Sequence, residues 1–296
     1  MRDKMYFMSR RFIFLSSLII LGITSIRSQD YIKYYNLRNE AVHHYLSDHL
    51  EKSEELLSEA IVEADPLGKD LYLLAIIKAK LGNKKEAEKH LKLAIAKEGV
   101  PSSWLIEDAQ IFRTVFDSIQ YDSVLNFVNV QWEYIEFEFS HNPFNIKLEY
   151  WVDSLIKQDQ KYRSLVNPED YMPGILDSLR TLSDLQTQYR LMQHVKDHGW
   201  PQRSSELLTT ILLHFTRENY NKYKDNILEE VRAGRLDPYW YASMVDRLES
   251  LIYDNPCTYG IWGDCEAYAD LIFHNRLEIG LSPYWNGPYR IYKRLN

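Results

Sequence analysis

The chain repeats itself at an interval of 34 residues between positions 29 and about 100. Small residues recur at this interval in three pairs: Ala41 and Ala75, Ser53 and Ala87, and Ala60 and Ala94. Two helices cross closely only where a small side chain lies at the contact. A period of this length with small residues at fixed positions therefore predicts a stack of paired helices. Leu81-Gly82-Asn83 is the predicted turn within the second pair, where Gly82 provides the helix stop.

The two segments that carry this repeat resemble tetratricopeptide repeats: HYLSDHLEKSEELLSEAI and LAIIKAKLGNKKEAEKHLKLAI. The resemblance implies that a concave surface of the array binds a peptide or a protein partner. The first segment departs from the pattern, because it has Asp48 where the second has Gly82. Two hairpins alone would expose an apolar edge, so we expect the stretch from Trp104 to Val128 to cap them. Together these elements form a predicted repeat domain over residues 29–130.

Ionisable residues lie on the apolar stripes of the helices predicted in the second half of the chain. Asp159 and Arg163 continue one stripe, His214 lies within another, and Asp246 and Arg247 lie inside a third. Burying such groups costs several kcal/mol unless they are paired or hydrogen-bonded. We therefore predict a polar cluster made of Asp159, Gln160, Arg163, His214, Asp246, Arg247 and Tyr259.

Turn residues mark the ends of the helices predicted in this half. Gly199 and Pro201 end one long helix, Gly234 ends a later one, and Pro238 opens the next. The fold is therefore predicted to be all-α, with a short tetratricopeptide-like hairpin array followed by a multi-helix domain over residues 146–296. The stretch QWEYIEFEFSHNPFN, residues 131–145, is expected to be a connector or a short strand-like linker.

A set of motifs in residues 146–283 resembles an uncharacterised bacterial domain of unknown function. These motifs are Asp159-Gln160…Arg163, Gly199-Trp200-Pro201, His214, Tyr223, Gly234-x-Leu236, Tyr241-Ala242, Asp246-Arg247, Tyr259-Gly260 and Asn275-Arg276…Ile279-Gly280-Leu281. The resemblance implies a shared fold and supplies no activity. The chain departs from the pattern after Asp184, where Thr187 replaces an expected Asn, and at Cys257 and Ile261, where an amide and a hydroxyl are lost. If the family motifs form a catalytic site, these departures imply that the site of this chain is altered or impaired.

The first 28 residues have the pattern of a secretory signal peptide. Four basic residues precede the apolar run FIFLSSLIILGITSI, which is shorter than the ~20 residues of a membrane span. The alternative is an uncleaved N-terminal anchor. The segment holds five basic residues and one acidic residue, so cleavage would take the net charge from −7 to −11. We therefore expect an exported bacterial protein, periplasmic or extracellular, that has no membrane span after cleavage and does not bind nucleic acid.

Cys257 and Cys265 are the only two cysteines of the chain. In an oxidising compartment they could form a disulfide. The alternative is a pair of partly buried thiols. Clustered Cys and His spacings are absent from the sequence, so we expect no metal site.

Three functions remain open for the polar cluster. It could be a buried ion-pair lattice, a binding site for a small anion or peptide, or a hydrolase-like site. In the hydrolase-like site His214 would act as acid and base, Asp159 or Asp246 would orient it, and Arg163 or Arg247 would bind an anion. The sequence contains no Gly-x-Ser-x-Gly, phosphate-binding Gly-rich loop or His-Glu-x-x-His, and we expect no cofactor. Whether this domain is an enzyme is left open, and our leading hypothesis is a cell-envelope interaction or scaffold protein.

Aromatic residues suggest one further possibility, a surface that binds a glycan or a peptide. The chain holds 22 tyrosines and 7 tryptophans, most of them at the spacing of a helical core. An exposed row of Trp200, Trp262, Tyr284 and Trp285 would favour this hypothesis.

Overall fold

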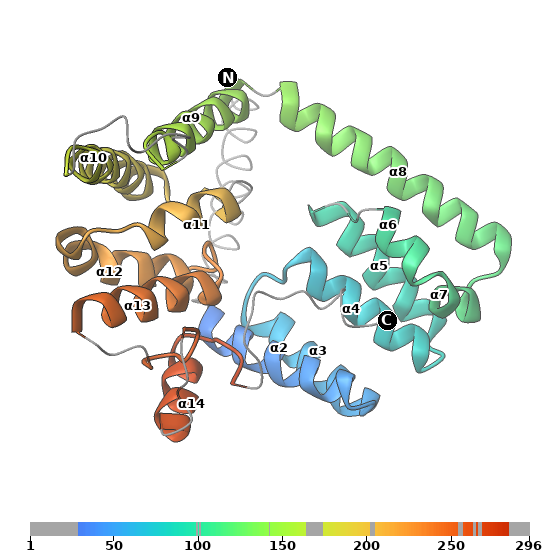
Figure 1. Ribbon diagram of the computed structural model, residues 1–296. Coiled ribbons are helices and arrows are strands. Elements are labelled where there is room, and N and C mark those ends of the chain that lie inside the picture. The colour runs from blue at the N-terminus through green and yellow to red at the C-terminus, as the bar shows by residue number, and fades with distance from the viewer. Residues whose placement is uncertain are drawn as a thin grey trace, which may run out of the picture.

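The computed structural model describes residues 29–98, 100, 102–141, 143–163, 174–201, 205–253, 257–262, 265 and 268–283. Thirteen helices and no strand are found among these residues, so the predicted all-α fold is confirmed (Figure 1). The N-terminal helices are α2 (Tyr31–Leu46), α3 (Leu50–Glu63), α4 (Gly68–Lys80), α5 (Lys84–Glu98), α6 (Ser102–Glu107), α7 (Ala109–Val115) and α8 (Ser118–His141). The C-terminal helices are α9 (Pro143–Gln160), α10 (Ile175–His198), α11 (Ser205–Leu213), α12 (Arg217–Arg232), α13 (Pro238–Tyr253) and α14 (Ala269–Glu278).

The small residues of the 34-residue repeat lie where helices pack in pairs. Helix α2 packs on α3, and α4 packs on α5. All six of these residues are buried: Ala41, Ser53, Ala60, Ala75, Ala87 and Ala94. The Ser53 hydroxyl donates a hydrogen bond of 2.6 Å to the Ala41 carbonyl, which is possible only because the two helices approach closely.

Equivalent turns join the helices of each pair. Asp48 and Gly82, which are 34 positions apart, both adopt a positive φ, of 60° and 74°. Glycine adopts this left-handed conformation without steric cost, and aspartate is one of the few other residues that tolerate it. The departure from the repeat pattern at Asp48 therefore keeps the turn geometry.

Helices α6, α7 and α8 cover the open edge of the second pair. Phe112 of α7 is fully buried and lies 5.8 Å, centroid to centroid, from the Tyr72 ring of α4. Tyr121 of α8 is buried and donates a hydrogen bond of 2.6 Å to the Leu105 carbonyl. These helices bury the apolar surface that two hairpins would leave exposed.

Of the two alternatives expected for residues 131–145, a connector or a short strand-like linker, the strand-like one is wrong. Helix α8 continues to His141 and α9 begins at Pro143, so helices occupy both ends of this stretch. The alternation of acidic and aromatic residues in EYIEFEF imitates the period of a strand over a few positions only. Once a helix is nucleated, each further residue adds a hydrogen bond, and here the helix extends through the alternating stretch.

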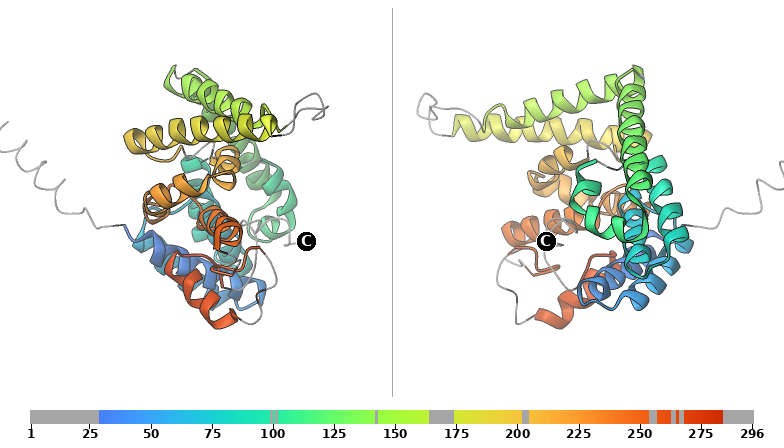
Figure 2. Two further views of the ribbon diagram at one scale, coloured as in Figure 1. Left: turned by 60° about the vertical axis from the view of Figure 1, so that its left-hand side comes forward. Right: turned by 90° about the vertical axis from the view of Figure 1, so that its right-hand side faces the viewer.

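The first described helix packs against the last ones, so the chain closes on itself. The Asn36 side chain donates a hydrogen bond of 2.8 Å to the Leu277 carbonyl, and Asn39 donates one of 3.0 Å to the Gly280 carbonyl. Helix α2 also packs on α12. In both views of Figure 2, α14 lies beside the α2–α3 pair. The repeat domain and the C-terminal domain therefore meet directly as well as through α8.

A second core holds the C-terminal helices together. It contains Leu155 of α9, Leu191 of α10, Ile211 of α11, Ile227 of α12 and Met244 of α13, all of them fully buried. Helix α10 ends at His198 with Gly199 at φ 77°, Gly234 follows α12 at φ 71°, and α13 begins at Pro238. The helix ends predicted from these turn residues are therefore confirmed.

Within the described ranges, no helix has the length and apolar character that a bilayer crossing requires. The predicted signal segment, residues 1–28, lies outside these ranges.

We predict that Gly280→Ala destabilises the protein through the contact between α2 and the segment that follows α14. Gly280 has φ 72°, and an added Cβ would lie 2.7 Å from the Cβ of Tyr35 in α2. Gly82→Ala is the matched control, because Gly82 has φ 74° and open space around the same position. The control should cost about 1 kcal/mol from backbone strain alone, and Gly280→Ala about 2–4 kcal/mol, measured by urea unfolding. Equal losses would contradict a close approach of α2.

Candidate functional site

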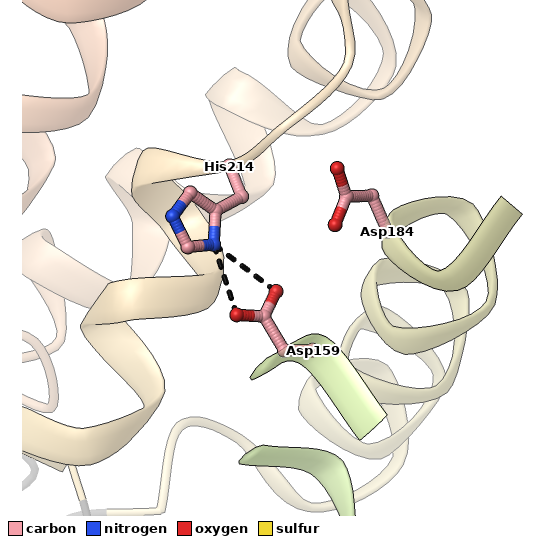
Figure 3. A group of neighbouring side chains, drawn as sticks. All are labelled: Asp159, Asp184 and His214. Carbon is pink, nitrogen blue, oxygen red and sulfur yellow. Dashed lines mark hydrogen bonds and ion pairs between the residues drawn. The ribbon is translucent and has the colours of Figure 1, made fainter. Parts of the chain in front are cut away.

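A histidine and an aspartate from distant helices form the centre of the candidate site. Asp159 lies in the last turn of α9 and is fully buried, and His214 lies in the turn that follows α11. The His214 Nδ1 is 2.9 Å from Oδ2 and 3.1 Å from Oδ1 of Asp159 (Figure 3). An ionised carboxylate only accepts hydrogen bonds, so Nδ1 carries the hydrogen. In neutral His214 this leaves Nε2 with its lone pair, on the side of the ring that faces away from Asp159.

Arg163 joins this pair to a second carboxylate, Asp184 of α10. Its NH1 and NH2 groups lie 2.8 Å from the Oδ1 and Oδ2 atoms of Asp184, and NH1 also donates 2.7 Å to the Asp159 carbonyl. Burial alone would lower the pKa of Arg163, but the hydrogen bonds and the charges of both carboxylates raise it. Gln160 donates a hydrogen bond of 2.6 Å to Asp159 Oδ2. The end of α9 and the turn after it thus supply three of the predicted residues to one cluster.

The turn that carries His214 is fixed by a buried glutamine that the sequence analysis missed. The Gln188 side chain donates 2.7 Å to the His214 carbonyl and accepts from the backbone N–H of Thr216 and the amide of Asn219. Gln188 lies four residues after Asp184, on the same face of α10. This spacing was the available signal for both residues. The sequence analysis placed Asp184 only in a family motif from which the chain departs at Thr187, and it did not single out Gln188.

Two carboxylates and a histidine at this spacing raise the question of a metal ion. One donor atom from each of Asp159, Asp184 and His214 can be chosen so that all lie within 4.8 Å of one another. The sequence analysis did not expect such a group. Arg163 already pairs with Asp184 through both nitrogens and lies 3.7 Å from Asp159 Oδ1. Ion pairing with Arg163 therefore accounts for the arrangement without a metal.

The predicted single cluster divides in two, because Asp246 belongs to a different group. Its Oδ1 and Oδ2 atoms accept hydrogen bonds of 2.7 and 2.6 Å from the backbone N–H groups of Tyr259 and Ile261. Arg276 of α14 donates to the carbonyls of the same loop, at 2.7 Å to Tyr259 and 3.3 Å to Gly260. Asp246 and Arg276 thus hold the loop between α13 and α14 by its backbone.

The remaining predicted residues also lie in this second region. The structure joins Cys257 and Cys265 by a disulfide across the same loop. Tyr259 is buried, which raises the pKa of its hydroxyl, and its ring lies 6.1 Å from that of Tyr241. Arg247 is partly buried, and its Nε lacks a hydrogen-bond partner among the described residues. None of these contacts involves His214.

The Gly-Trp-Pro motif has a structural role. The backbone N–H of Trp200 donates 2.8 Å to Glu230 of α12, and Arg235 pairs with the same carboxylate through two nitrogens. Trp200 is buried, whereas Trp262 is 42% exposed. Tyr284 and Trp285 lie outside the described residues, so the proposed aromatic row loses Trp200 and is not tested in full.

The repeat domain carries a separate candidate site, a pocket of about 830 Å³ at its turns, here named the turn pocket. Its lining includes Asp48, Leu50, Gly82, Lys84, Ile111 and Val115. Two of these pairs, Asp48 with Gly82 and Leu50 with Lys84, are 34 positions apart. The pocket is thus formed by equivalent positions of both hairpins and bounded on one side by α7.

No family model, no curated protein and no solved structure matches this chain. The two resemblances noted in the sequence therefore remain predictions.

We predict that Arg163→Met destabilises the protein by about 2–4 kcal/mol at neutral pH. The substitution keeps an unbranched side chain but removes the guanidinium, which leaves two buried carboxylates without their cation. Arg232→Met is the control, because Arg232 pairs with Glu229 at the surface and should change stability by less than about 1 kcal/mol. Chemical denaturation measures both. Similar small losses would show that the Arg163 pairs contribute little to the fold.

We predict a pH dependence of stability that comes from Asp246. Burial raises the pKa of this carboxyl to about 6, and its two backbone hydrogen bonds and Arg276 only partly oppose the shift. Between about pH 4 and 6 the folded state keeps a proton on Asp246 that the unfolded state releases. The contribution of Asp246 to stability therefore falls as pH rises through this range and is constant above about pH 6.

The test compares wild type with Asp246→Asn, which cannot ionise, from pH 4 to pH 7. The difference in unfolding free energy between the two proteins should change by about 2–3 kcal/mol over this range. Asp122→Asn, at an exposed position of α8, controls for general charge effects. A constant difference for Asp246→Asn would show that its pKa is not raised.

Proposed function

We propose that this protein is an exported cell-envelope interaction or scaffold protein, whose repeat domain binds a protein or peptide partner. The turn pocket is the observation that carries the proposal. It is open, it is formed by both hairpins together with α7, and its volume of about 830 Å³ suits several side chains of a bound segment.

The lining of the turn pocket favours a short segment of mixed character. Leu50, Ile111 and Val115 supply apolar surface, while Lys80 and Lys84 supply positive charge in the lining. Lys84 donates a hydrogen bond of 2.6 Å to Gln120, and Lys80 lies 4.6 Å from the centroid of the Tyr45 ring. Both ammonium groups are therefore held near the pocket by neighbours, so we expect an apolar segment with acidic or polar flanks to bind.

Export is supported by two features of the chain. The basic and apolar pattern of residues 1–28 is typical of a secretory signal. The disulfide between Cys257 and Cys265 is the kind of bond that persists in an oxidising compartment. A periplasmic or extracellular location is proposed on these grounds.

The Asp159–His214 pair supports a second candidate function, a small-ligand or hydrolase-like site in the C-terminal domain. Asp159 orients the imidazole so that Nε2 can accept a proton, which is the arrangement of a general base. Arg163, proposed from the sequence as an anion clamp, is engaged by Asp184 through both nitrogens. The pair thus has a base and its orienting group, but the cation that the described residues place beside it is already paired with Asp184, so we place this function second.

A peptide screen tests the leading proposal. Peptides selected from a random display library against residues 29–296 should bind the turn pocket, so Ile111→Glu and Val115→Glu should each weaken binding at least about tenfold, measured by fluorescence anisotropy. Leu251→Glu, an exposed change on α13, is the control and should leave binding unchanged. Peptides that bind all variants equally would place the partner site elsewhere.

A substrate panel tests the second function. Wild type and His214→Gln would be assayed on ester, phosphoester and peptide substrates, with unfolding measured in parallel. Hydrolysis by wild type that falls about 100-fold or more in a folded His214→Gln variant would support a catalytic base. Equal rates in both proteins would exclude this role for His214.

A further inference from the structure

Two histidines face each other across the turn that joins α2 and α3. His44 lies in the last turn of α2, and His49 directly precedes α3. The Nδ1 atom of His44 is 3.5 Å from the Nδ1 atom of His49. The ring centroids lie 5.6 Å apart, so these two nitrogens lie on the facing sides of their rings. Two ring nitrogens are thus directed at one small region of space.

The backbone of the turn brings the two rings together. Residues five positions apart in a continuous helix point about 140° away from each other. Here the chain leaves the helix at Asp48, which has φ 60°, and the His49 N–H donates a hydrogen bond of 2.9 Å to the His44 carbonyl. The His49 side chain makes no capping hydrogen bond to α3, so its ring is available for another partner.

Glu40 favours one hydrogen position on the His44 ring. Its Oε1 atom lies 3.9 Å from the His44 Nε2 atom, one helical turn earlier. A carboxylate at this place favours the tautomer that carries the hydrogen on Nε2, which leaves the lone pair on Nδ1, facing His49. A carboxylate behind the second ring nitrogen is also the usual companion of a metal-binding histidine.

The distance between the two nitrogens suits a bridging metal ion better than a hydrogen bond. At 3.5 Å, the two Nδ1 atoms are further apart than the about 2.7–3.2 Å of an ordinary hydrogen bond from nitrogen. A Zn²⁺ ion with tetrahedral geometry and bonds of about 2.0–2.1 Å holds two ligand nitrogens about 3.3–3.4 Å apart. Small side-chain movements therefore bring both imidazoles within bonding distance of one ion.

We propose that His44 and His49 bind one divalent metal ion of the class that prefers imidazole nitrogen, such as Zn²⁺, Ni²⁺ or Cu²⁺, through their Nδ1 atoms. Glu40 positions the His44 ring from the other side. Water fills the remaining coordination positions, because the His44 side chain is 26% exposed and His49 is exposed. The ion joins the end of α2 to the start of α3. The site does not depend on the function assigned to the turn pocket.

The sequence analysis expected no metal site, because it searched for clustered Cys and His spacings. His44 and His49 lie in different helical segments, and their approach depends on the left-handed turn at Asp48. A spacing of five residues is therefore a metal-binding spacing only in this turn.

Isothermal titration calorimetry with ZnCl₂ tests the site in the protein spanning residues 29–296. Wild type should bind Zn²⁺, and His49→Gln should weaken this binding at least about tenfold. His198→Gln is the matched control, because it removes one member of another histidine pair, His194 and His198, whose ring centroids are 4.9 Å apart. This control should bind Zn²⁺ as wild type does. Equal affinity of wild type and His49→Gln, or a loss in His198→Gln alone, would overturn the proposal.

Nitrogen-15 NMR of the histidine side chains gives a second readout, in wild type itself. Without metal, the His44 ring should carry its hydrogen on Nε2. Added ZnCl₂ should shift the Nδ1 resonances of His44 and His49 together, whereas MgCl₂ should not, because Mg²⁺ prefers oxygen ligands. Zn²⁺ should also raise the melting temperature of wild type but not that of His49→Gln. Nδ1 resonances of His44 and His49 that stay unchanged in excess ZnCl₂ would refute the proposal.

Discussion

The contact between α2 and the C-terminal helices is the constraint on which the rest of the arrangement depends. Asn36 and Asn39 donate to carbonyls at and just beyond the end of α14, where a helix leaves acceptors without internal partners. The same helix packs on α3 within the first hairpin, so α2 belongs to both cores. A repeat array that is held at its first helix and continued by α8 at its last cannot change curvature freely. We therefore expect the turn pocket to be preformed, which lowers the entropic cost of binding a segment.

Buried charge fixes α2 against α4 within the repeat domain. Arg38 is fully buried, and its NH1 atom lies 3.7 Å from the Oδ2 atom of Asp70 in α4. The Arg38 guanidinium also lies over the Tyr35 ring. The Tyr34 hydroxyl donates a hydrogen bond to the same Asp70 carboxylate. Burial raises the pKa of Tyr34 well above its ordinary value, so its hydroxyl remains a donor. Such a network is costly to break and specifies one packing of α2 against α4.

The sequence predicted the helices better than it predicted the site. Small residues at a fixed interval predict close helix contacts, and Gly or Pro predicts a helix end from a few neighbouring residues. The structure agrees: Ala41 is buried, Gly199 ends α10 and Pro238 begins α13. The strand-like linker failed because a local alternation cannot oppose propagation of α8. The polar cluster was predicted from stripes of single helices, and a stripe does not say which helices meet. Asp159 and Asp246 therefore looked alike in sequence although they lie in different clusters. Asp184 was undervalued because its partner Arg163 lies on a different segment, in the turn that follows α9.

The buried charges of the C-terminal domain differ in what they bind, and this difference bears on function. Three of these charged groups contact the backbone of non-helical segments. Asp246 accepts from the N–H groups of Tyr259 and Ile261, Arg276 donates to the Gly260 carbonyl, and Glu230 accepts from the Trp200 N–H. Those contacts replace the hydrogen bonds that secondary structure would supply, and structural need explains them. The carboxylate of Asp159 is held instead by the side chains of His214 and Gln160. The Asp159 carboxylate therefore stabilises no loop backbone directly, and one nitrogen of the His214 imidazole faces away from it. Asp246, Arg276 and Glu230 have a structural role, whereas the Asp159–His214 pair is available for a chemical one.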